Sequence, residues 1–563
     1  MPTRRRSSAL VLAFATALAA PAMAEIDAGA YLAAHVAGGS SDFSAAARYY
    51  SRALSADPGN RALTESALLA FVGLGQVDKA VPLARVVAGA ADDSQAAFMV
   101  MLAHRALSGD WDGMGRSLAG GQRVGPLFDG LARGWSLVGQ GDRAGAEAAF
   151  DTVAQEERVM AFALYHKALA LASLGAFADA DRVIVSGGLG LTRRGALAHA
   201  QILSQLGRNA DALAVLKQTF GGRSDAVIAD LAARLAAGDR VDFDIVRNAN
   251  DGMAETYYSI AKALNGDASD SYTLLYARIA RYLRPDHVDA AMLAGALLSD
   301  LGRDDLATLA FGEVPAGHAG RDAAEAGQAD ALRAMGRDEE AMVRLRALID
   351  RNPDNPSYRI SVGDVLRSLE RYDEAAVAYD SAIALYSDER PEHWRTYFVR
   401  GISFERTGQW DKAEADLRKA LALNPDQPQV LNYLGYSLVE MRAKLDEALA
   451  MIERAAAAQP ESGYITDSLG WVLYRLGRFA EAVEPMERAV QLMPVDAVVN
   501  DHLGDVYWMV GRRLEAEFQW RRALSFVDQD DSGEADPDRI RQKLDIGLDA
   551  VLSQETDVAD DGG

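Results

Sequence analysis

The segment "DSLGWVLYRLGRFAEAVEPMERAVQLMP" runs from Asp467 to Pro494 and raises a question about helix packing. Its residues favour a helix, yet Gly470 stands inside it, directly before Trp471. Glycine in a helix interior costs up to ~1 kcal/mol relative to alanine. After this glycine come Ala482 at an interval of 12 residues, Ala489 after 7 more and Pro494 after another 5. A helical sequence that keeps such a glycine needs a packing reason.

The same intervals recur along the carboxy-terminal part of the chain. They are found in Gly401, Ala413, Ala420 and Pro425, in Gly504, Ala516 and Ala523, and, after one inserted residue near Lys444, in Gly435, Ala448, Ala455 and Pro460. The period is 34 residues, which is typical of stacked helical repeats. One repeat cannot bury its apolar face alone, so neighbouring repeats must stack. The sequence therefore predicts an all-α chain built as an α-solenoid.

Residues between about 322 and 526 resemble the tetratricopeptide repeat (TPR) family. The Leu-Gly pair of that family is present at Leu434-Gly435, Leu469-Gly470 and Leu503-Gly504, and its following aromatic residue at Phe404 and Tyr507. The resemblance implies helix-turn-helix units in a right-handed superhelix, with the first helix of each unit lining a concave groove that binds other proteins or peptide segments.

The domain organisation follows from how regular the repeats are. We expect a signal peptide at 1–24, degenerate TPR-like repeats at 25–253, a TPR array at 254–526 (most regular at 322–526), an acidic linker and capping helix at 527–554, and a disordered acidic tail at 555–563. The capping helix is predicted from Asp536 as its N-cap and Pro537 in its first turn. Repeat boundaries between about 85 and 253 stay open.

The amino terminus has the pattern of an export signal. Three arginines, Arg4 to Arg6, precede an apolar segment, and Ala22-Met23-Ala24 supplies small residues before Glu25. No later stretch is apolar enough to suggest a membrane span, so we expect no membrane insertion after cleavage. The predicted location is the periplasm, with full secretion as an alternative. A retained amino-terminal anchor is the other interpretation of this segment.

The charge and the reactive residues narrow the function. The formal net charge of −23 becomes −26 without the three signal-peptide arginines, which argues against binding nucleic acid. The chain has no cysteine, and its 8 histidines are scattered, so we expect no catalytic site, metal site or cofactor. The acidic stretch 528–539 is interpreted as a solvated linker. A calcium loop stays an alternative, although Arg539 stands where a bidentate glutamate is needed.

The predicted binding site comes from the positions that line the groove in the family. Carried over to this sequence, they are Asn432, Tyr436, Tyr464, Asp467, Trp471, Tyr474, Arg475, Asp501, Asp505 and Trp508. Aromatic residues beside polar groups often mark binding surfaces. The alternative is that these rings pack between successive helices.

These features predict a non-enzymatic protein–protein interaction scaffold of the bacterial periplasm or cell envelope. The alternatives are an accessory factor for envelope polymer or outer-membrane assembly and, less favoured, an enzyme. The sequence does not identify the partner or the oligomeric state.

The export signal makes a testable prediction. The mature protein should begin at Glu25, because the small-residue pattern ends at Ala24. Intact-mass measurement of the protein purified from the periplasmic fraction checks this. Retention of residues 1–24 would contradict it.

Overall fold

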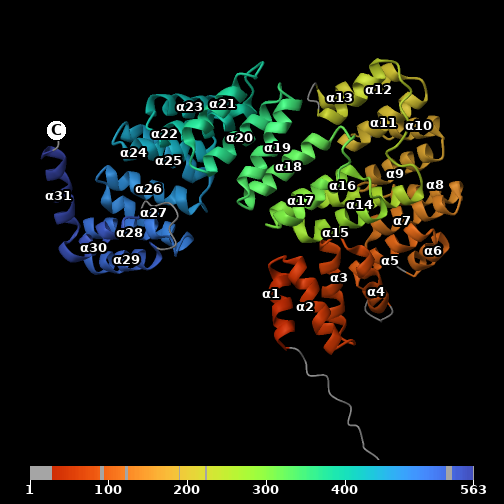
Figure 1. The fold of residues 1–563 in the computed structure, drawn as a ribbon, viewed down its shortest axis with the longest axis horizontal. Helices are drawn as coiled ribbons and strands as arrows, with labels where there is room; N and C mark the ends of the chain where they lie inside the picture. Colours follow the sequence, from red (N-terminus) through yellow and green to blue (C-terminus); the bar gives the residue numbers. More distant parts are fainter. Residues whose placement is uncertain are drawn as a thin grey trace, which may run out of the picture. The chain divides into compact units, whose positions relative to one another are not determined.

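The computed structural model describes residues 28–88, 94–120, 124–188, 190–221, 225–527 and 535–561. The predicted signal peptide and residues 528–534 of the acidic stretch 528–539 lie outside these residues. Within the described ranges the chain forms helices and no strand (Figure 1). It divides into two compact units, Met1–Arg344 and Leu345–Gly563, and the division falls inside helix α19 (Asp338–Arg351).

Unit 1 begins with twelve helices that form six antiparallel pairs. Their bounds are α1 Ala28–Gly39, α2 Phe43–Ala56, α3 Arg61–Gly73, α4 Val77–Val87, α5 Gln95–Ser108, α6 Trp111–Ala119, α7 Pro126–Gly139, α8 Arg143–Val153, α9 Met160–Ser173, α10 Phe177–Ser186, α11 Arg193–Gln205 and α12 Asn209–Phe220. Odd-numbered members are the first helices of their pairs. A glycine forms the turn within each of the last five pairs. These glycines are Gly75, Gly109, Gly141, Gly175 and Gly207, with φ values of +76°, +72°, +80°, +77° and +74°. Glycine adopts this left-handed backbone without steric cost.

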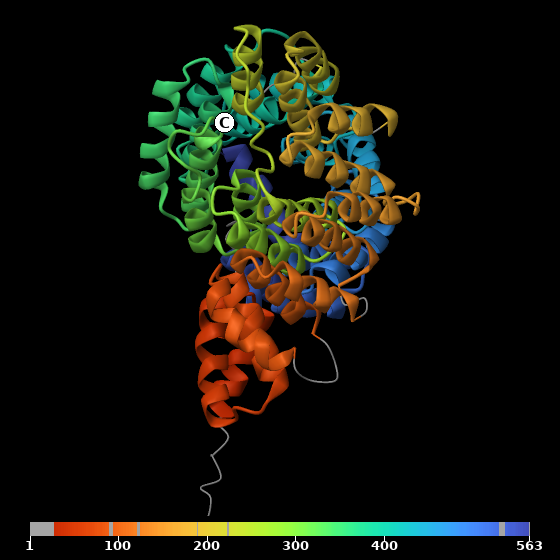
Figure 2. The ribbon, with the colours of Figure 1, turned by 90° about the vertical axis from the view of Figure 1, so that its right-hand side faces the viewer.

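The rest of unit 1 continues from α13 to the start of α19. Its helices are α13 Ala226–Ala236, α14 Ala249–Leu264, α15 Asp270–Leu283, α16 Val288–Asp300, α17 Asp304–Gly312 and α18 Arg321–Ala334. Helix α14 packs against the first helices α5, α7 and α9, and α15 packs against α3 and α5 (Figures 1 and 2). The α14–α15 hairpin therefore covers the first-helix face of the amino-terminal pairs.

The division into compact units differs from the division by repeat regularity. The sequence placed the change in regularity between residues 253 and 254, whereas residues 254–344 belong to the same compact unit as the amino-terminal repeats. The physical reason is burial: Met253 and Tyr257 of α14 are fully buried in the unit 1 core. The structure places the division about ninety residues later, inside α19.

Unit 2 consists of helix pairs followed by two terminal helices. The bounds are α20 Pro356–Ser368, α21 Tyr372–Ile383, the short 3₁₀ helix η1 Pro391–His393, α22 Trp394–Arg406, α23 Trp410–Leu423, α24 Pro428–Glu440, α25 Leu445–Ala458, α26 Gly463–Arg475, α27 Phe479–Leu492, α28 Ala497–Met509, α29 Arg513–Phe526, α30 Pro537–Ile546 and α31 Leu548–Asp561. Here the even-numbered helices α20 to α28 are the first helices. At the inserted residue, Arg442 and Lys444 both adopt a left-handed backbone, with φ of +51° and +49°.

The spacing that recurs between the repeats of this chain reflects one contact. A Cβ atom on Gly470 would lie 2.5 Å from Cγ of Met486, which is 16 residues later on the paired helix. The same contact joins Gly504 to Trp520, where the distance would be 2.4 Å. It recurs in unit 1 between Gly134 and Phe150, again at 2.4 Å. The glycine leaves room for a large side chain against its backbone, which answers the question raised by Gly470.

The carboxy terminus forms two helices where one was predicted. Asp536 caps α30 as expected, since its side chain accepts hydrogen bonds from the backbone N–H groups of Asp538 and Arg539. The chain then breaks at Gly547, whose φ is +84° and whose Cβ position lies 2.7 Å from the Trp508 ring. Helix α31 continues to Asp561, so residues 555–561 are helical where a disordered tail was predicted.

The glycine contact predicts the effect of adding one methyl group. Gly504→Ala should lower the free energy of unfolding by about 1–2 kcal/mol, because Trp520 is fully buried and overpacking outweighs the gain in helix propensity. Urea unfolding of the full chain measures this. Gly39→Ala is the matched control, since nothing lies within 4 Å of its Cβ position, and it should lose no stability. Equal stability of both variants would show that the Trp520 ring is free to shift.

Candidate functional site on the first helices of unit 2

The ten residues predicted to line a groove lie on three successive first helices, α24, α26 and α28. Tyr464 is exposed, with 67% of its surface accessible. The half-buried members are Asn432, Tyr436, Arg475 and Trp508. The buried members are Asp467, Trp471, Tyr474, Asp501 and Asp505. The structure thus brings the set together on neighbouring helices and leaves half of it accessible.

Trp471 packs between helices. Its ring stacks on Tyr474 of its own helix, with centroids 4.8 Å apart, and on His502 of α28, with centroids 3.9 Å apart. Its indole N–H donates a hydrogen bond to Oε1 of Glu440 on α24 at 2.7 Å. Only 8% of Trp471 is accessible. The ring therefore joins three successive first helices, as the packing alternative predicted, and it is not a free anchor for a partner.

His502 is held by the carboxylate of Asp467. Its Nδ1 lies 3.0 Å from Oδ2 of Asp467, and both residues are buried. Burial lowers the pKa of His502, but the nearby carboxylates of Asp467, Asp501 and Asp505 outweigh burial, so the net shift of its pKa is upward. A protonated His502 forms a buried ion pair with Asp467 and presents a cation to the Trp471 ring.

Asp501 and Asp505 are paired with the terminal helix α30. Lys543, which is fully buried, places its Nζ 2.8 Å from Oδ2 of Asp501 and 2.7 Å from Oδ1 of Asp505. The indole N–H of Trp520 also donates to Oδ1 of Asp505, at 2.9 Å. Burial raises the pKa of Asp501 more than Lys543 lowers it. These two aspartates fix the capping helix to the last repeat.

Trp508 borders the same capping region. Its indole N–H donates to Oδ2 of Asp549 on α31 at 3.1 Å, and its ring packs at 5.3 Å from that of Trp520. The guanidinium of Arg513 lies 4.6 Å from the Trp508 ring centroid. Part of the Trp508 side chain stays accessible to solvent, but its ring packs in the region where α31 is attached.

Sequence reasoning missed His502 and Lys543 as parts of this cluster. One signal was available: Asp501 and Asp505 stand one turn apart on a helix, where like charges repel. A cation was therefore needed at that face. The sequence does not say from which helix it comes.

Unit 1 buries a second set of charges where α14 meets the first helices. Glu255 of α14 accepts hydrogen bonds from Nε of Arg194 on α11 at 2.7 Å and from the hydroxyl of Tyr165 on α9 at 2.9 Å. Burial raises the pKa of Glu255, but Arg194 and His287 together outweigh burial, and the net shift of this pKa is downward. His166, hydrogen-bonded at its two ring nitrogens to Trp135 and Ser259, has its pKa lowered to about 4 by burial. These groups hold α14 in place.

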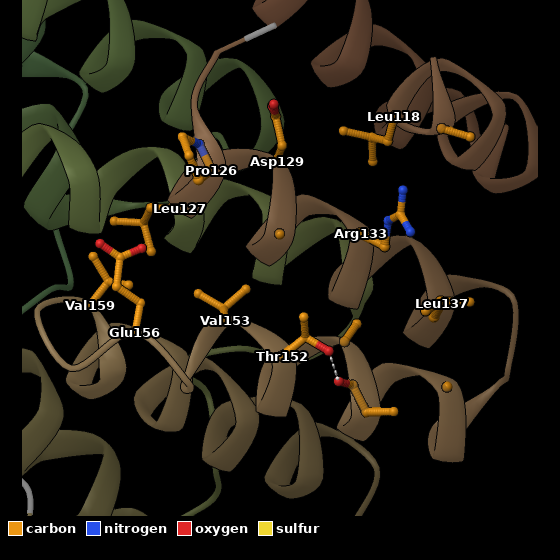
Figure 3. A pocket seen from close by; sticks show the side chains of 15 residues that line it. Leu118, Pro126, Leu127, Asp129, Arg133, Leu137, Thr152, Val153, Glu156 and Val159 are labelled. Atoms are coloured by element: carbon orange, nitrogen blue, oxygen red, sulfur yellow. Dashed lines mark hydrogen bonds between the residues drawn. The ribbon is translucent and has the colours of Figure 1, made fainter. Parts of the chain in front are cut away.

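Unit 1 also has a cavity of about 590 Å³ between α6, α7 and α8. Its lining is mostly small or apolar and includes Leu118, Leu127, Leu137 and Val153 (Figure 3). The charged residues of the lining are Asp129, Glu156 and Arg133, and Arg133 is exposed.

The described ranges lack two further kinds of feature, a cluster of metal ligands and a membrane-spanning helix. Among these residues no group of three or more histidine, aspartate or glutamate side chains is arranged to hold a metal ion. None of the described helices combines the length and apolar character needed to span a membrane.

Comparison with known proteins identifies the repeats. The tetratricopeptide repeat family matches residues 31–96, 131–180, 327–391, 394–427 and 434–497. A segment of 159 residues, 28% of this chain, is 31% identical to a TPR repeat-containing protein of Pseudomonas aeruginosa and covers 26% of it. A match of 176 residues is 26% identical to the human protein O-mannosyl-transferase TMTC1 and covers 31% of this chain and 20% of that protein. The chain thus matches about a quarter or less of the length of these relatives.

Solved structures are also similar to this chain. The Cut9-Hcn1 hetero-tetramer of the APC/C is similar over 92% of this chain and 96% of that chain, with 16% identity and a TM-score of 0.40. YrrB, described as a TPR protein with an unusual peptide-binding site, is similar over 33% of this chain and 92% of that chain, with 20% identity and a TM-score of 0.28.

The helix pairs, their turn glycines and the family matches define the class as an all-α solenoid of paired helices. This chain is a tetratricopeptide repeat protein, a class whose repeats form scaffolds for protein–protein interaction.

The His502–Asp467 pair predicts how stability depends on pH. Because the folded-state pKa of His502 is raised, its stabilising effect is complete below the unfolded pKa of about 6.5 and is lost as the pH rises through the folded value. Asp467→Asn removes the carboxylate that raises this pKa, so it should flatten the decline. Urea unfolding of both chains at about pH 6 and pH 8.5 measures the difference. If the free energy of unfolding changed with pH equally in the two chains, Asp467 would not be what raises the pKa of His502.

Proposed function

We propose that this protein is a non-catalytic scaffold of the bacterial periplasm that binds polypeptide segments on the first-helix face of unit 2. The observation that supports this face most directly is Tyr464, a large aromatic side chain with 67% of its surface accessible on α26. Half-buried Tyr436 on α24 supplies a second aromatic ring on the same face. Rings that are partly covered and carry a polar end are frequent anchors in protein interfaces.

The charges of this face narrow the partner. Asp467, Asp501 and Asp505 are each paired within the protein, with His502 or Lys543. They do not offer a free negative rim, so basic residues are not needed in the bound segment. Arg475, whose side chain is 18% accessible, lies 3.6 Å from Glu440 and 5.8 Å from the Trp471 ring. Binding at this face should depend mainly on aromatic and apolar groups, so the affinity should change little with salt concentration.

A role without catalysis agrees with how the reactive groups are used. The buried titratable residues of unit 2 form ion pairs that fasten neighbouring helices, such as Lys543 with Asp501. Those of unit 1 fasten α14, such as Arg194 with Glu255. Groups committed to such pairs are structural, because breaking one partner leaves a buried charge uncompensated.

The periplasmic location rests on the amino-terminal sequence. The arginines Arg4 to Arg6, the apolar segment and the small residues ending at Ala24 have the order of a secretory signal. An exported scaffold without cysteine depends on packing alone, which agrees with the dense contacts between helix pairs.

The proposal predicts a loss of partners from two substitutions. Tyr436→Ala with Tyr464→Ala should reduce the captured proteins by about thirty-fold, because truncating a true anchor costs ~2 kcal/mol or more. Crosslinking in the periplasm, affinity purification of the full chain and quantitative mass spectrometry measure this.

Glu481→Ala with Glu484→Ala is the matched control, because both residues are exposed on the second helix α27. Circular dichroism melts must show that both double variants fold like the wild type. A folded Tyr436/Tyr464 variant that keeps every partner would refute binding at this face.

A further inference from the structure

A second cavity lies on the first-helix face of unit 1, beside α14. It measures about 310 Å³ and is bounded by α9, by the first turn of α11 with the residues before it, and by α14. Its lining residues include Phe162, Leu191, Tyr258 and Ala263. The walls are therefore largely apolar and aromatic, and the size is at the lower end of the range of ligand pockets.

Two charged residues that line this cavity already have partners within the protein. Glu255 and Arg194 line it, and they are joined by hydrogen bonds of 2.7 and 2.9 Å. Arg194 is also paired with Asp289. A ligand gains little by competing with these contacts, so recognition must come from the apolar walls and from charges elsewhere on the lining.

One such charge is Lys262. It lines the cavity from α14, is exposed, and forms no ion pair with any of the residues that the structure describes. The other cations of the lining are already paired: Arg193 with Asp225 and Asp289, and Arg194 with Glu255 and Asp289. Lys262 is therefore the cation of this lining that has no ion pair among the described residues, and its ammonium group complements a negative charge.

The same face already holds a polypeptide. Helix α14 packs on α5, α7 and α9, and the Tyr257 hydroxyl donates to the backbone oxygen of Met99 at 2.7 Å. Gly252 approaches the Trp135 ring so closely that a Cβ atom would lie 2.2 Å from it. The first-helix face of unit 1 therefore binds a helical segment of its own chain, and the cavity is an open part of that face beside α14.

We infer that this cavity binds a polypeptide partner that inserts one large apolar side chain and places an adjacent carboxylate at Lys262. The apolar walls hold the side chain, and the unpaired ammonium group selects the acidic neighbour. This site goes beyond the proposed binding face of unit 2 and is independent of it. The acidic surface as a whole attracts basic partners, whereas this cavity selects a partner with an acidic group.

The test uses a phage-displayed library of random linear peptides, selected on the full-length protein. Enriched peptides should combine a large apolar residue with an adjacent acidic residue or a free carboxy terminus. Their affinities are then measured by fluorescence polarisation. Ala161→Trp, which fills the cavity from α9, should weaken them at least about ten-fold. Lys262→Glu should weaken them by roughly five-fold at low salt and less at high salt.

Two matched controls keep the test specific. Ala148→Trp fills the other unit 1 cavity from an equally exposed alanine, and Lys217→Glu reverses another exposed lysine without an ion pair among the described residues. Neither should change binding by the selected peptides. Circular dichroism of each variant confirms its fold.

Three results would overturn the inference. The first is that the wild-type chain enriches no peptide more strongly than the Ala161→Trp chain does, and the second is that the enriched peptides carry no acidic group. The third is that Ala148→Trp and Ala161→Trp lower the peptide affinity equally. The Tyr436/Tyr464 variant distinguishes the two proposals. It should keep the peptides bound in unit 1 even where it loses the partners of unit 2.

Discussion

The fold depends on the contact between a glycine backbone on one helix and a large side chain on its partner. At Gly470, Gly504 and Gly134 a Cβ atom would lie within 2.5 Å of Met486, Trp520 or Phe150. Glycine weakens a helix by up to ~1 kcal/mol, but here it allows a fully buried side chain to fill the space between the helices. A buried side chain of this size stabilises by more than the glycine costs, so the repeat keeps both.

This contact explains how far the sequence predicts the structure. The helix pairs follow from the intervals around Gly470, and the turns follow from glycines such as Gly75 and Gly207, which do adopt positive φ. Both are local consequences of residue type. The predicted cap at Asp536 is also local and is confirmed. The break at Gly547 was missed because it depends on the Trp508 ring, which is distant in sequence.

The candidate site was less predictable for a physical reason. The spacing around a marker glycine shows which helix face a residue occupies, but not what covers that face. Trp471 is on the expected face, yet His502 of the next first helix stacks on it at 3.9 Å. In unit 1 the whole hairpin from α14 to α15 lies over the corresponding face. Nothing in the helical pattern of residues 249–283 distinguishes such a return from one more repeat.

The two first-helix faces are closed by different means, and this difference decides what each can still bind. In unit 2 aromatic rings and ion pairs fill the space between neighbouring first helices. The surface still available for binding is therefore that of exposed residues such as Tyr464. In unit 1 a separate helix covers the face, and the open part is a cavity with a wall from α14 itself. Buried ion pairs suit this task because they tolerate few alternative arrangements, although they add little stability compared with apolar packing. Glu255, with partners on α9 and α11, fixes the position of α14 and thereby the shape of the cavity beside it.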